Sequence, residues 1–404
     1  MKMLLVHRYI RPDTPGYAHM LYIMGRHFAA KGHDVTIFSA QPSYNDAYQG
    51  DKLPTKQRVD GMTIIRTPLL KESKKNAIRR ALNFVIFCSS LFCHAVFRRQ
   101  AYDLMTITTF PPSVMGLTAR VIGCFRKTEY LYHCMDLYPE LAQASGILKR
   151  KWLAKISSLI DRRNCSRAKA VVVLSDDMKQ TVMRRGVSGD NLHVINNFII
   201  DQYDPDRQED LTPAALMNPD GRFRVLFAGN IGRFQSLDTV IEAAKIVANP
   251  DIEFWFVGSG LMVDNLKEQA GDLLGKSVFF HPYLPIEKVM GVIANSHLGI
   301  VSLLPGVIDS AYPSKTMSYL EAGCKLLTLV ESESELAEFV ESEKIGAVCG
   351  KPDPVEMASL ISREYEQQRK TGYDRALVRA AGRNHFGQDV ILNQWIHLID
   401  SLSP

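Results

Sequence analysis

The chain of 404 residues lacks the cysteine patterns that hold small secreted domains or zinc sites together. Its seven cysteines are odd in number and contain no Cys-x-x-Cys pair, which argues against a disulfide framework and against a zinc ribbon. The first apolar run, residues 3–6, is too short for the apolar core of a signal peptide, and no small-residue cleavage site follows it. A reduced, cytosolic chain is therefore expected.

Several binding motifs are missing as well. No Gly-x-Gly-x-x-Gly follows the first predicted strand and no P-loop occurs, so neither dinucleotide binding of that type nor P-loop chemistry is supported. The sequence has no RRM-like module and no helix-turn-helix pairing, and we expect no nucleic-acid partner. The composition, 46% hydrophobic and 23% charged, excludes a disordered chain, a collagen, a coiled coil and a multi-pass membrane protein.

The charged residues of the chain are distributed unevenly between its two halves. Residues 1–200 carry 30 basic and 14 acidic side chains, whereas residues 201–404 carry 18 and 29. The opposite signs suggest two bodies with different tasks, one of which faces something anionic. Most of the positive charge lies in two segments, residues 71–100 with a net charge of +6 and residues 146–185 with +8.

Short apolar runs alternate with helical periods along the whole chain. A strand at residues 2–7, a helix at 19–31 and a strand at 34–40 form a βαβ pattern, which predicts parallel strands joined by right-handed crossovers. Further strands are predicted at residues 103–108, 128–134, 168–174, 192–195, 223–228, 253–257, 278–280, 298–302 and 325–330. The fold class is therefore α/β, with two doubly wound, Rossmann-like domains joined by a polar linker at residues 201–221.

In an open α/β sheet, ligands bind beyond the carboxyl ends of the strands, so the loops there are candidate sites. The loop at residues 229–235 has glycines that let a ligand approach the backbone, a following helix with unpaired N–H groups, and the charge of Arg233. It suits a diphosphate. A tight turn that needs glycine for its conformation is the alternative, and Gly258 and Gly260 repeat both possibilities more weakly.

These loops belong to a series of motifs in a fixed order. The motifs are Pro-x-x-Pro-Gly at 12–16, Gly-His-Asp-Val at 32–35, Tyr-His-Cys-Met-Asp-Leu-Tyr-Pro-Glu at 132–140, Val-Ile-Asn-Asn-Phe at 194–198, the segment 229–235 with Leu-Asp at 237–238, Val-Gly-Ser-Gly at 257–260, and Pro-Ser-Lys at 313–315 leading into Tyr-Leu-Glu-Ala-Gly at 319–323. Together they resemble a GT-B-fold glycosyltransferase of the family 4 type, as found among the bacterial sugar transferases of O-antigen, capsule and exopolysaccharide assembly. The resemblance covers nearly the whole chain.

The resemblance implies two domains that face each other across a cleft. An acceptor-side domain would span residues 1–200 and a donor-nucleotide domain residues 222–384. The last segment, residues 385–404, would carry a helix at 389–402 that crosses back to the first domain.

The resemblance also implies roles for individual residues. His133 would lie near the transferred sugar, with Asp136 and Glu140 as further catalytic residues; a structural histidine is the alternative. Arg233 matches the basic residue that neutralises the donor diphosphate, where fixed positive charge is the main catalytic need. The implied donor-binding residues are Gly16, Gly229, Asn230, Gly232, Arg233, Gln235, Gly258, Gly260, Ser314, Lys315, Ser318 and Glu321.

The sequence departs from the family pattern at two places. The usual pair of glutamates eight positions apart is replaced by Ser310 and Ser318, and Glu321 lies three positions further on. Glu321 would bind the donor ribose, or it is a surface residue. The usual lysine after the Gly-Arg segment is replaced by Gln235, and Lys315 would supply that charge instead.

The implied function is the transfer of a hexosyl or N-acetylhexosaminyl group from a nucleotide-sugar, with UDP favoured, to a lipid-linked or saccharide acceptor, with retention. No metal and no cofactor are expected, and the Asp-x-Asp at residues 204–206 is read as a solvated part of the linker. A sugar-nucleotide 2-epimerase of the same fold and a non-catalytic binding protein are the alternatives.

Both basic segments include an apolar helical face. Residues 81–97 are uncharged between two arginine pairs and predict a helix that dips into one leaflet, or one packed entirely on the sheet. A second helix, from residue 149, places Trp152, Ile156 and Leu159 on one face with cations beside them. The alternative there is a solvated basic face. We expect a cytoplasmic protein bound peripherally to the anionic inner face of the cell membrane.

Overall fold

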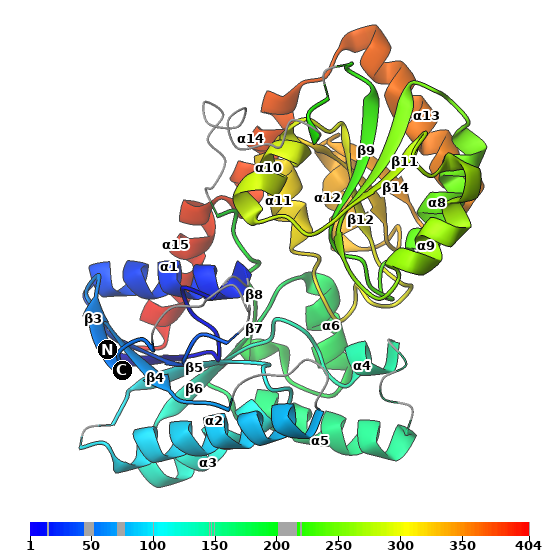
Figure 1. Ribbon diagram of the computed structural model, residues 1–404. Coiled ribbons are helices and arrows are strands. Elements are labelled where there is room, and N and C mark those ends of the chain that lie inside the picture. The colour runs from blue at the N-terminus through cyan, green and yellow to red at the C-terminus, as the bar shows by residue number, and fades with distance from the viewer. Residues whose placement is uncertain are drawn as a thin grey trace. The chain divides into compact units, whose positions relative to one another are not determined.

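A computed structural model describes residues 1–13, 16–43, 52–70, 77–99, 101–144, 146, 148, 150–200, 216–218 and 220–403 (Figure 1). The chain forms two compact units, one made of Met1–Asn196 together with the residues from Leu392 onward, the other of Asn197–Ile391. Most of the predicted linker, including the Asp-x-Asp at 204–206, lies outside the described residues, as do residues 71–76 of the first basic segment.

The first unit is built on one eight-stranded sheet. Its strands are β1 Lys2–Val6, β2 Asp34–Ala40, β3 Lys56–Val59, β4 Met62–Thr67, β5 Leu104–Thr108, β6 Glu129–His133, β7 Ala170–Val173 and β8 Leu192–Val194. They lie in the order β3-β4-β2-β1-β5-β6-β7-β8, and only the β3–β4 pair is antiparallel. The central strands are apolar and buried almost throughout, as expected for parallel strands covered on both faces. The β3–β4 hairpin is absent from the sequence prediction.

Helices cover both faces of this sheet. They are α1 Gly16–Ala30, α2 Ala77–Phe97, α3 Val114–Arg126, α4 Glu140–Ala144, α5 Lys151–Arg167 and α6 Asp176–Arg184. Helices α2, α3 and α5 lie side by side on one face, whereas α1 lies on the other (Figure 1). The two predicted basic, apolar helices are therefore neighbours of one common helix, α3.

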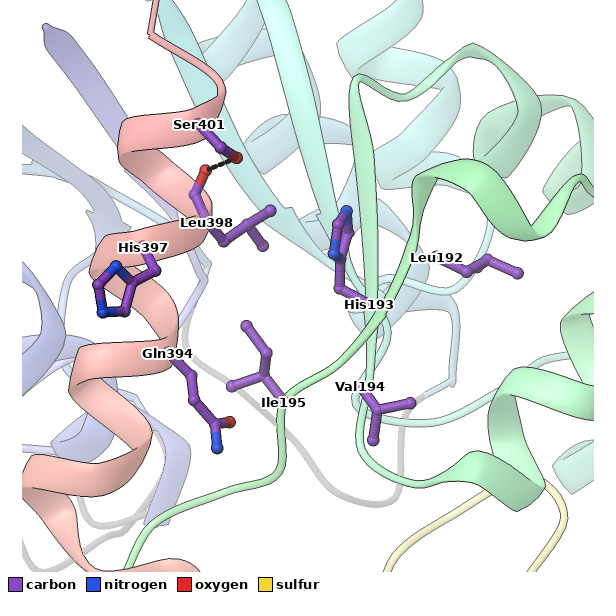
Figure 2. Close-up of a pocket in the computed structure, with 8 residues that line it drawn as sticks. All are labelled: Leu192, His193, Val194, Ile195, Gln394, His397, Leu398 and Ser401. Carbon is purple, nitrogen blue, oxygen red and sulfur yellow. Dashed lines mark hydrogen bonds between the residues drawn. The ribbon is translucent and has the colours of Figure 1, made fainter.

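The C-terminal helix α15, Gln388–Ser401, joins the first unit from Leu392 onward. Figure 2 shows it beside the edge strand β8, with an open hollow of about 490 Å³ between them. The hollow is lined by Leu192, His193, Val194, Ile195, Gln394, His397, Leu398 and Ser401. No residue of the predicted site lines it.

The second unit is a six-stranded parallel sheet with helices on both sides. Its strands are β9 Phe223–Asn230, β10 Ile252–Ser259, β11 Val278–His281, β12 Leu298–Ser302, β13 Lys325–Leu329 and β14 Gly346–Cys349, in the order β11-β10-β9-β12-β13-β14. Its helices are α8 Leu237–Val247, α9 Val263–Ala270, α10 Ile286–Ala294, α11 Lys315–Glu321, α12 Glu335–Ser342, α13 Pro354–Thr371 and α14 Arg375–Phe386. Phenylalanines of β9 and β10 form the centre of its core against α8 and α13. Two parallel-sheet units confirm the predicted α/β fold.

A buried ion-pair network joins three elements of the first unit. The Arg185 guanidinium, at the end of α6, donates to Asp161 of α5 at 2.6 Å and to Glu140 of α4 at 2.8 Å. The Tyr132 hydroxyl of β6 donates to the other oxygen of Asp161 at 2.8 Å. Because the side chains of Arg185 and Asp161 are only 5% and 2% exposed, each depends on the other for charge compensation.

Removing the cation from this network should destabilise the first unit. Arg185→Met leaves the Asp161 carboxylate buried without its counter-ion, a change that costs about 3–5 kcal/mol in comparable buried pairs. The exposed neighbour Arg184 offers a matched control, and Arg184→Met should change the unfolding free energy by less than about 1 kcal/mol. Urea unfolding followed by far-ultraviolet circular dichroism tests this, and equal midpoints for both variants would contradict it.

Candidate functional site

Each sheet has one place where the strand order reverses. In the first unit β1 lies between β2 and β5, and in the second β9 lies between β10 and β12. Loops that leave the carboxyl ends of strands diverge at such a point and create the binding site of an open α/β sheet. The loops after β1, β5 and β6 in one unit, and after β9 and β10 in the other, are therefore the candidate sites.

The last residues of β9 and β10, and the loops that follow them, touch through their backbones. Gly229 and Gly258 are register partners, and a Cβ atom on Gly258 would lie 1.8 Å from the Gly229 carbonyl oxygen. A Cβ on Gly260 would lie 2.0 Å from the Ile231 carbonyl oxygen. Both φ angles at the register pair are positive, +138° and +151°. Close backbone contact therefore requires glycine at 258 and 260, and the positive φ of Gly258 fits the conformational alternative at that position; a donor contact of either residue stays a prediction.

The loop after β9 is also fixed from within. The Gly232 N–H donates to the Gln235 side-chain oxygen at 2.9 Å, and Ile231 donates to the Ser259 carbonyl at 3.0 Å. Gly229, Asn230 and the Arg233 side chain remain exposed. In the part of the chain that the structure describes, no carboxylate pairs with Arg233, so its charge is available to a ligand.

Lys315, the first residue of α11, lies next to Gly229 at the end of β9. Its Nζ lies 3.7 Å from the centroid of the Phe227 ring and 3.9 Å from the position of a Cβ on Gly229. The side chain is half-buried, and this burial lowers the pKa of Lys315 from 10.5 to about 7. A cation held over an aromatic ring without a carboxylate partner among the described residues is suited to receive an anionic ligand. The sequence pointed to Lys315 but not to Phe227.

Helix α11 is tied to β9 by Tyr319, whose hydroxyl accepts from the Ala228 N–H at 2.8 Å. Two residues on, Glu321 is 1% exposed and receives two bonds from Arg383 of α14, at 2.7 and 3.3 Å. The interpretation of Glu321 as a surface residue is therefore wrong. Ser314 is exposed and Ser318 half-buried, and their donor contacts stay predictions.

In the first unit, His133 ends β6 in a fully buried aromatic cluster. Its Nδ1 lies 3.0 Å from the Tyr17 hydroxyl, and its ring lies 4.8 Å from that of Trp395. Burial, followed by the nearby His7, lowers the pKa of His133 to about 3, so the ring is neutral at neutral pH. Its buried Nε2 has no hydrogen-bond partner among the residues that the structure describes. A neutral ring with an unused nitrogen can donate or accept a hydrogen bond but does not carry a charge.

The other two predicted catalytic residues, Asp136 and Glu140, have partners other than His133. Among the described residues, no hydrogen bond joins His133, Asp136 and Glu140 to one another. Asp136 is half-buried, and burial raises the pKa of its carboxyl to about 6. The Glu140 carboxylate is instead held by Arg185 in the ion-pair network described above.

Sequence reasoning missed most of the surroundings of His133. His7 follows β1, bonds to Thr108 at 3.0 Å and packs edge-on against Tyr17, with ring centroids 4.7 Å apart. Its place at the end of the first strand was a usable signal. No signal in the sequence pointed to Trp395, because 262 positions separate it from His133 and only the return of α15 brings the two residues together. The Gly16 position has open space for a Cβ, and its donor role stays a prediction.

The outer surface of the α2, α3 and α5 layer is unusually apolar. Of the 22 large hydrophobic side chains exposed on the described residues, 12 lie on these three helices. They are Ile78, Leu82, Val85 and Phe97 on α2, Val114, Leu117, Val121 and Phe125 on α3, and Trp152, Leu153, Ile156 and Leu159 on α5. We call this set the apolar face. Basic residues surround it, including Arg79 and Arg80 on α2 and Lys155, Arg162 and Arg163 on α5.

Comparison with known proteins identifies the two units. Residues 16–197 match the family described as "Glycosyl transferase 4-like domain", and residues 222–367 match "Glycosyl transferases group 1". The chain belongs to the GT4-like glycosyltransferases. The expectation of a transferase is thereby confirmed, and the alternative of a non-catalytic binding protein is not supported.

This glycosyltransferase is 24% identical over 365 residues to the putative colanic acid biosynthesis glycosyl transferase WcaI of Escherichia coli, covering 88% of the chain and 90% of that protein. Its structure is similar to sucrose-phosphate synthase of Thermosynechococcus elongatus, with a TM-score of 0.76, 15% identity and coverage of 99% and 98%. It is also similar to Anabaena HepE in complex with UDP-glucose, with a TM-score of 0.70, 16% identity and coverage of 99% and 100%. These structures confirm the GT-B fold.

The lowered pKa of Lys315 predicts a pH-dependent stability of this glycosyltransferase. Since the pKa falls from 10.5 in the unfolded chain to about 7 in the fold, unfolding takes up a proton between these pH values, and the unfolding free energy rises with pH there. Lys315→Met should remove this contribution and stabilise the protein below pH 7. Thermal midpoints from pH 6 to 10 test this, with the exposed Lys370→Met as control; parallel curves for wild type and Lys315→Met would contradict it.

Proposed function

We propose that this glycosyltransferase moves a sugar from a UDP-sugar to a lipid-linked or saccharide acceptor in the synthesis of a surface polysaccharide or lipopolysaccharide. The main support for this proposal is the position of Lys315. Its half-buried amine lies beside the exposed Gly229 backbone, where the strand order of the second unit reverses. Two relatives support it: WcaI is named for colanic acid biosynthesis, and HepE binds UDP-glucose.

The proposed roles of the site residues follow from the negative charge of the leaving nucleoside diphosphate. A nucleoside diphosphate leaves in this transfer, so negative charge grows on its β-phosphate as the glycosidic bond breaks. Arg233 and Lys315 would stabilise that charge, with the N-terminal end of α8 adding a weaker contribution. His133, being neutral, would not supply a proton. Transfer with retention, and without a metal or cofactor, is part of the proposal.

We further propose that the apolar face holds the enzyme on the anionic inner face of the cell membrane. Helix α2 is long and apolar enough to cross a membrane by length and composition alone. However, its inner side is built into the first unit: Phe87 and Leu91 are fully buried, and the Asn83 side chain bonds both backbone groups of Leu70, at 2.9 and 3.0 Å. A helix that lies in the interface, with only its outer side in lipid, keeps these contacts.

Removing either proposed phosphate ligand should weaken UDP binding. Lys315→Met and Arg233→Ala should each lower the affinity by about 10–100-fold, the range expected for a lost charge-assisted hydrogen bond. Because binding of the diphosphate would raise the pKa of Lys315 above 7, wild-type affinity should also fall as the pH rises from 7 to 9, with proton uptake. Isothermal titration calorimetry with UDP in buffers of different ionisation enthalpy measures both effects.

The matched control is Lys370→Met, which removes an exposed lysine from α13 and should bind UDP as wild type does. Wild-type affinity in Lys315→Met and Arg233→Ala would rule out the assigned phosphate site. Turnover is then read by mass from a screen of nucleotide-sugars with a membrane lipid extract. Product formed without any acceptor would indicate the epimerase alternative instead.

Membrane docking should be visible in the tryptophan fluorescence. The chain has three tryptophans, of which Trp152 is 56% exposed on the apolar face, whereas Trp255 and Trp395 are buried. Vesicles that contain phosphatidylglycerol should shift the emission to the blue, and brominated acyl chains should quench it, because only Trp152 can enter lipid. Trp152→Phe should lose the shift but still float with vesicles. Unchanged emission and no flotation of the wild type would contradict docking.

A further inference from the structure

The C-terminal end of α5 carries a hollow lined mainly by arginines. Its volume is about 380 Å³, and its lining is Leu159, Arg162, Arg163, Ser166 and Arg167. Three guanidiniums and one hydroxyl supply hydrogen-bond donors, and the lining contains no carboxylate. Among the described residues, none of the three arginines forms an ion pair. Clustered cations without counter-ions repel one another, and a bound anion would relieve that repulsion.

Part of this hollow is held in place by a neighbouring element. The guanidinium of Arg162 packs against Gly186, where an added Cβ would lie 3.1 Å from Nη2. Gly186 has a φ of +80°, so glycine is the residue that suits this turn after α6. The remaining arginines, Arg163 and Arg167, are one helical turn apart and project from the same side of α5.

The hollow continues directly into the apolar face. Trp152, Ile156, Leu159 and Arg163 recur at spacings of four, three and four residues, so one stripe of α5 runs from apolar side chains into the arginines. Leu159 belongs to both, because it lines the hollow and is 53% exposed. An anion in the hollow would therefore lie next to exposed hydrocarbon, as the headgroup of a lipid lies next to its acyl chains.

Helix α3 makes that hydrocarbon surface continuous. Its Ser113 lies against α5, where the Asn164 side chain donates to its carbonyl at 2.8 Å. On the other side, the Phe125 ring lies 5.6 Å from that of Phe92 on α2. The exposed Leu117 and Val121 of α3 thus join the two segments that the sequence marked as separate patches.

We propose that the hollow at the end of α5 binds the phosphate headgroup of an anionic phospholipid, whose acyl chains then lie against the apolar face. The inference rests on the membrane docking proposed above and adds a specific headgroup site to it. A soluble phosphate ester has no acyl chain that could contact the exposed Leu159 and Ile156, whereas a phospholipid has one. A nucleic acid also brings phosphates, but Leu159, the exposed apolar side chain that lines the hollow, is aliphatic and gives its bases nothing to stack on there.

The test compares two double variants of equal charge. Arg163→Gln/Arg167→Gln removes two arginines of the hollow, and Arg26→Gln/Arg58→Gln removes two exposed arginines of the same unit, from α1 and β3. The first pair should lower the partition into phosphatidylcholine vesicles containing phosphatidylglycerol by about 30-fold, as expected for two cations at an anionic surface. The second pair should change it by less than about twofold, because charges beyond a Debye length are screened.

Three outcomes overturn the headgroup site. An equal loss for both pairs would mean that bulk charge alone drives binding. An unchanged partition in the Arg163→Gln/Arg167→Gln variant would mean that the hollow is not used. Displacement of wild-type protein from the vesicles by inorganic phosphate, beyond a chloride control of equal ionic strength, would identify free phosphate as the ligand.

Two further measurements separate this site from the rest of the proposed function. The UDP affinity of the Arg163→Gln/Arg167→Gln variant should equal that of wild type, since none of the proposed donor residues is changed, and its thermal midpoint should be no lower, since charge repulsion is removed. If wild-type protein does not bind the vesicles but binds UDP, the headgroup site and the docking proposal are both wrong, whereas the transferase proposal is unaffected. If wild type binds vesicles and the variant binds equally well, only the headgroup site fails.

Discussion

The candidate donor site depends on a backbone contact that only glycine permits. Where β9 and β10 end side by side, the carbonyl oxygen of Gly229 occupies the space that a Cβ of Gly258 would need. Parallel strands bring both loops to one edge of the sheet, so this contact sets how the loop after β9 can run. With the loop fixed in this way, its glycine backbone stays exposed next to Lys315, whose amine lies over the Phe227 ring.

Desolvation gives the two units different chemistry from similar folds. In the second unit it lowers the pKa of a lysine to about 7, so the amine can take up a proton when an anion binds, at a cost in stability. In the first unit it keeps His133 neutral, with a pKa of about 3, and one ring nitrogen there has no partner within the described part of the chain. One site is therefore suited to phosphate and the other carries no charge, which agrees with the proposed donor and acceptor sides.

The helical layer of α2, α3 and α5 differs from that of most water-soluble domains in the amount of apolar surface on its outer side. Such helices bury one side on the sheet and expose a polar side, yet here both sides of α2 and α3 are rich in hydrocarbon. Arginines lie around and at the end of this surface, and they account for much of the positive charge of the N-terminal half. A surface of this kind, with the headgroup hollow beside it, gives one explanation for the opposite charges of the two halves.

Local patterns in the sequence determined the α/β class, most of the parallel strands and the glycine loop after β9, because hydrophobic period and glycine placement are properties of neighbouring residues. They also led to Lys315 and His133 through the order of the motifs. The sequence did not predict the β3–β4 hairpin, whose polar, half-exposed strands give a weak signal, and it misjudged Glu321 as a possible surface residue. Packing alone decided that Glu321 pairs with Arg383, that Glu140 pairs with Arg185, and that Trp395 reaches His133. These contacts join residues 45 to 262 positions apart, and no local pattern encodes which distant side chain will neutralise a buried charge.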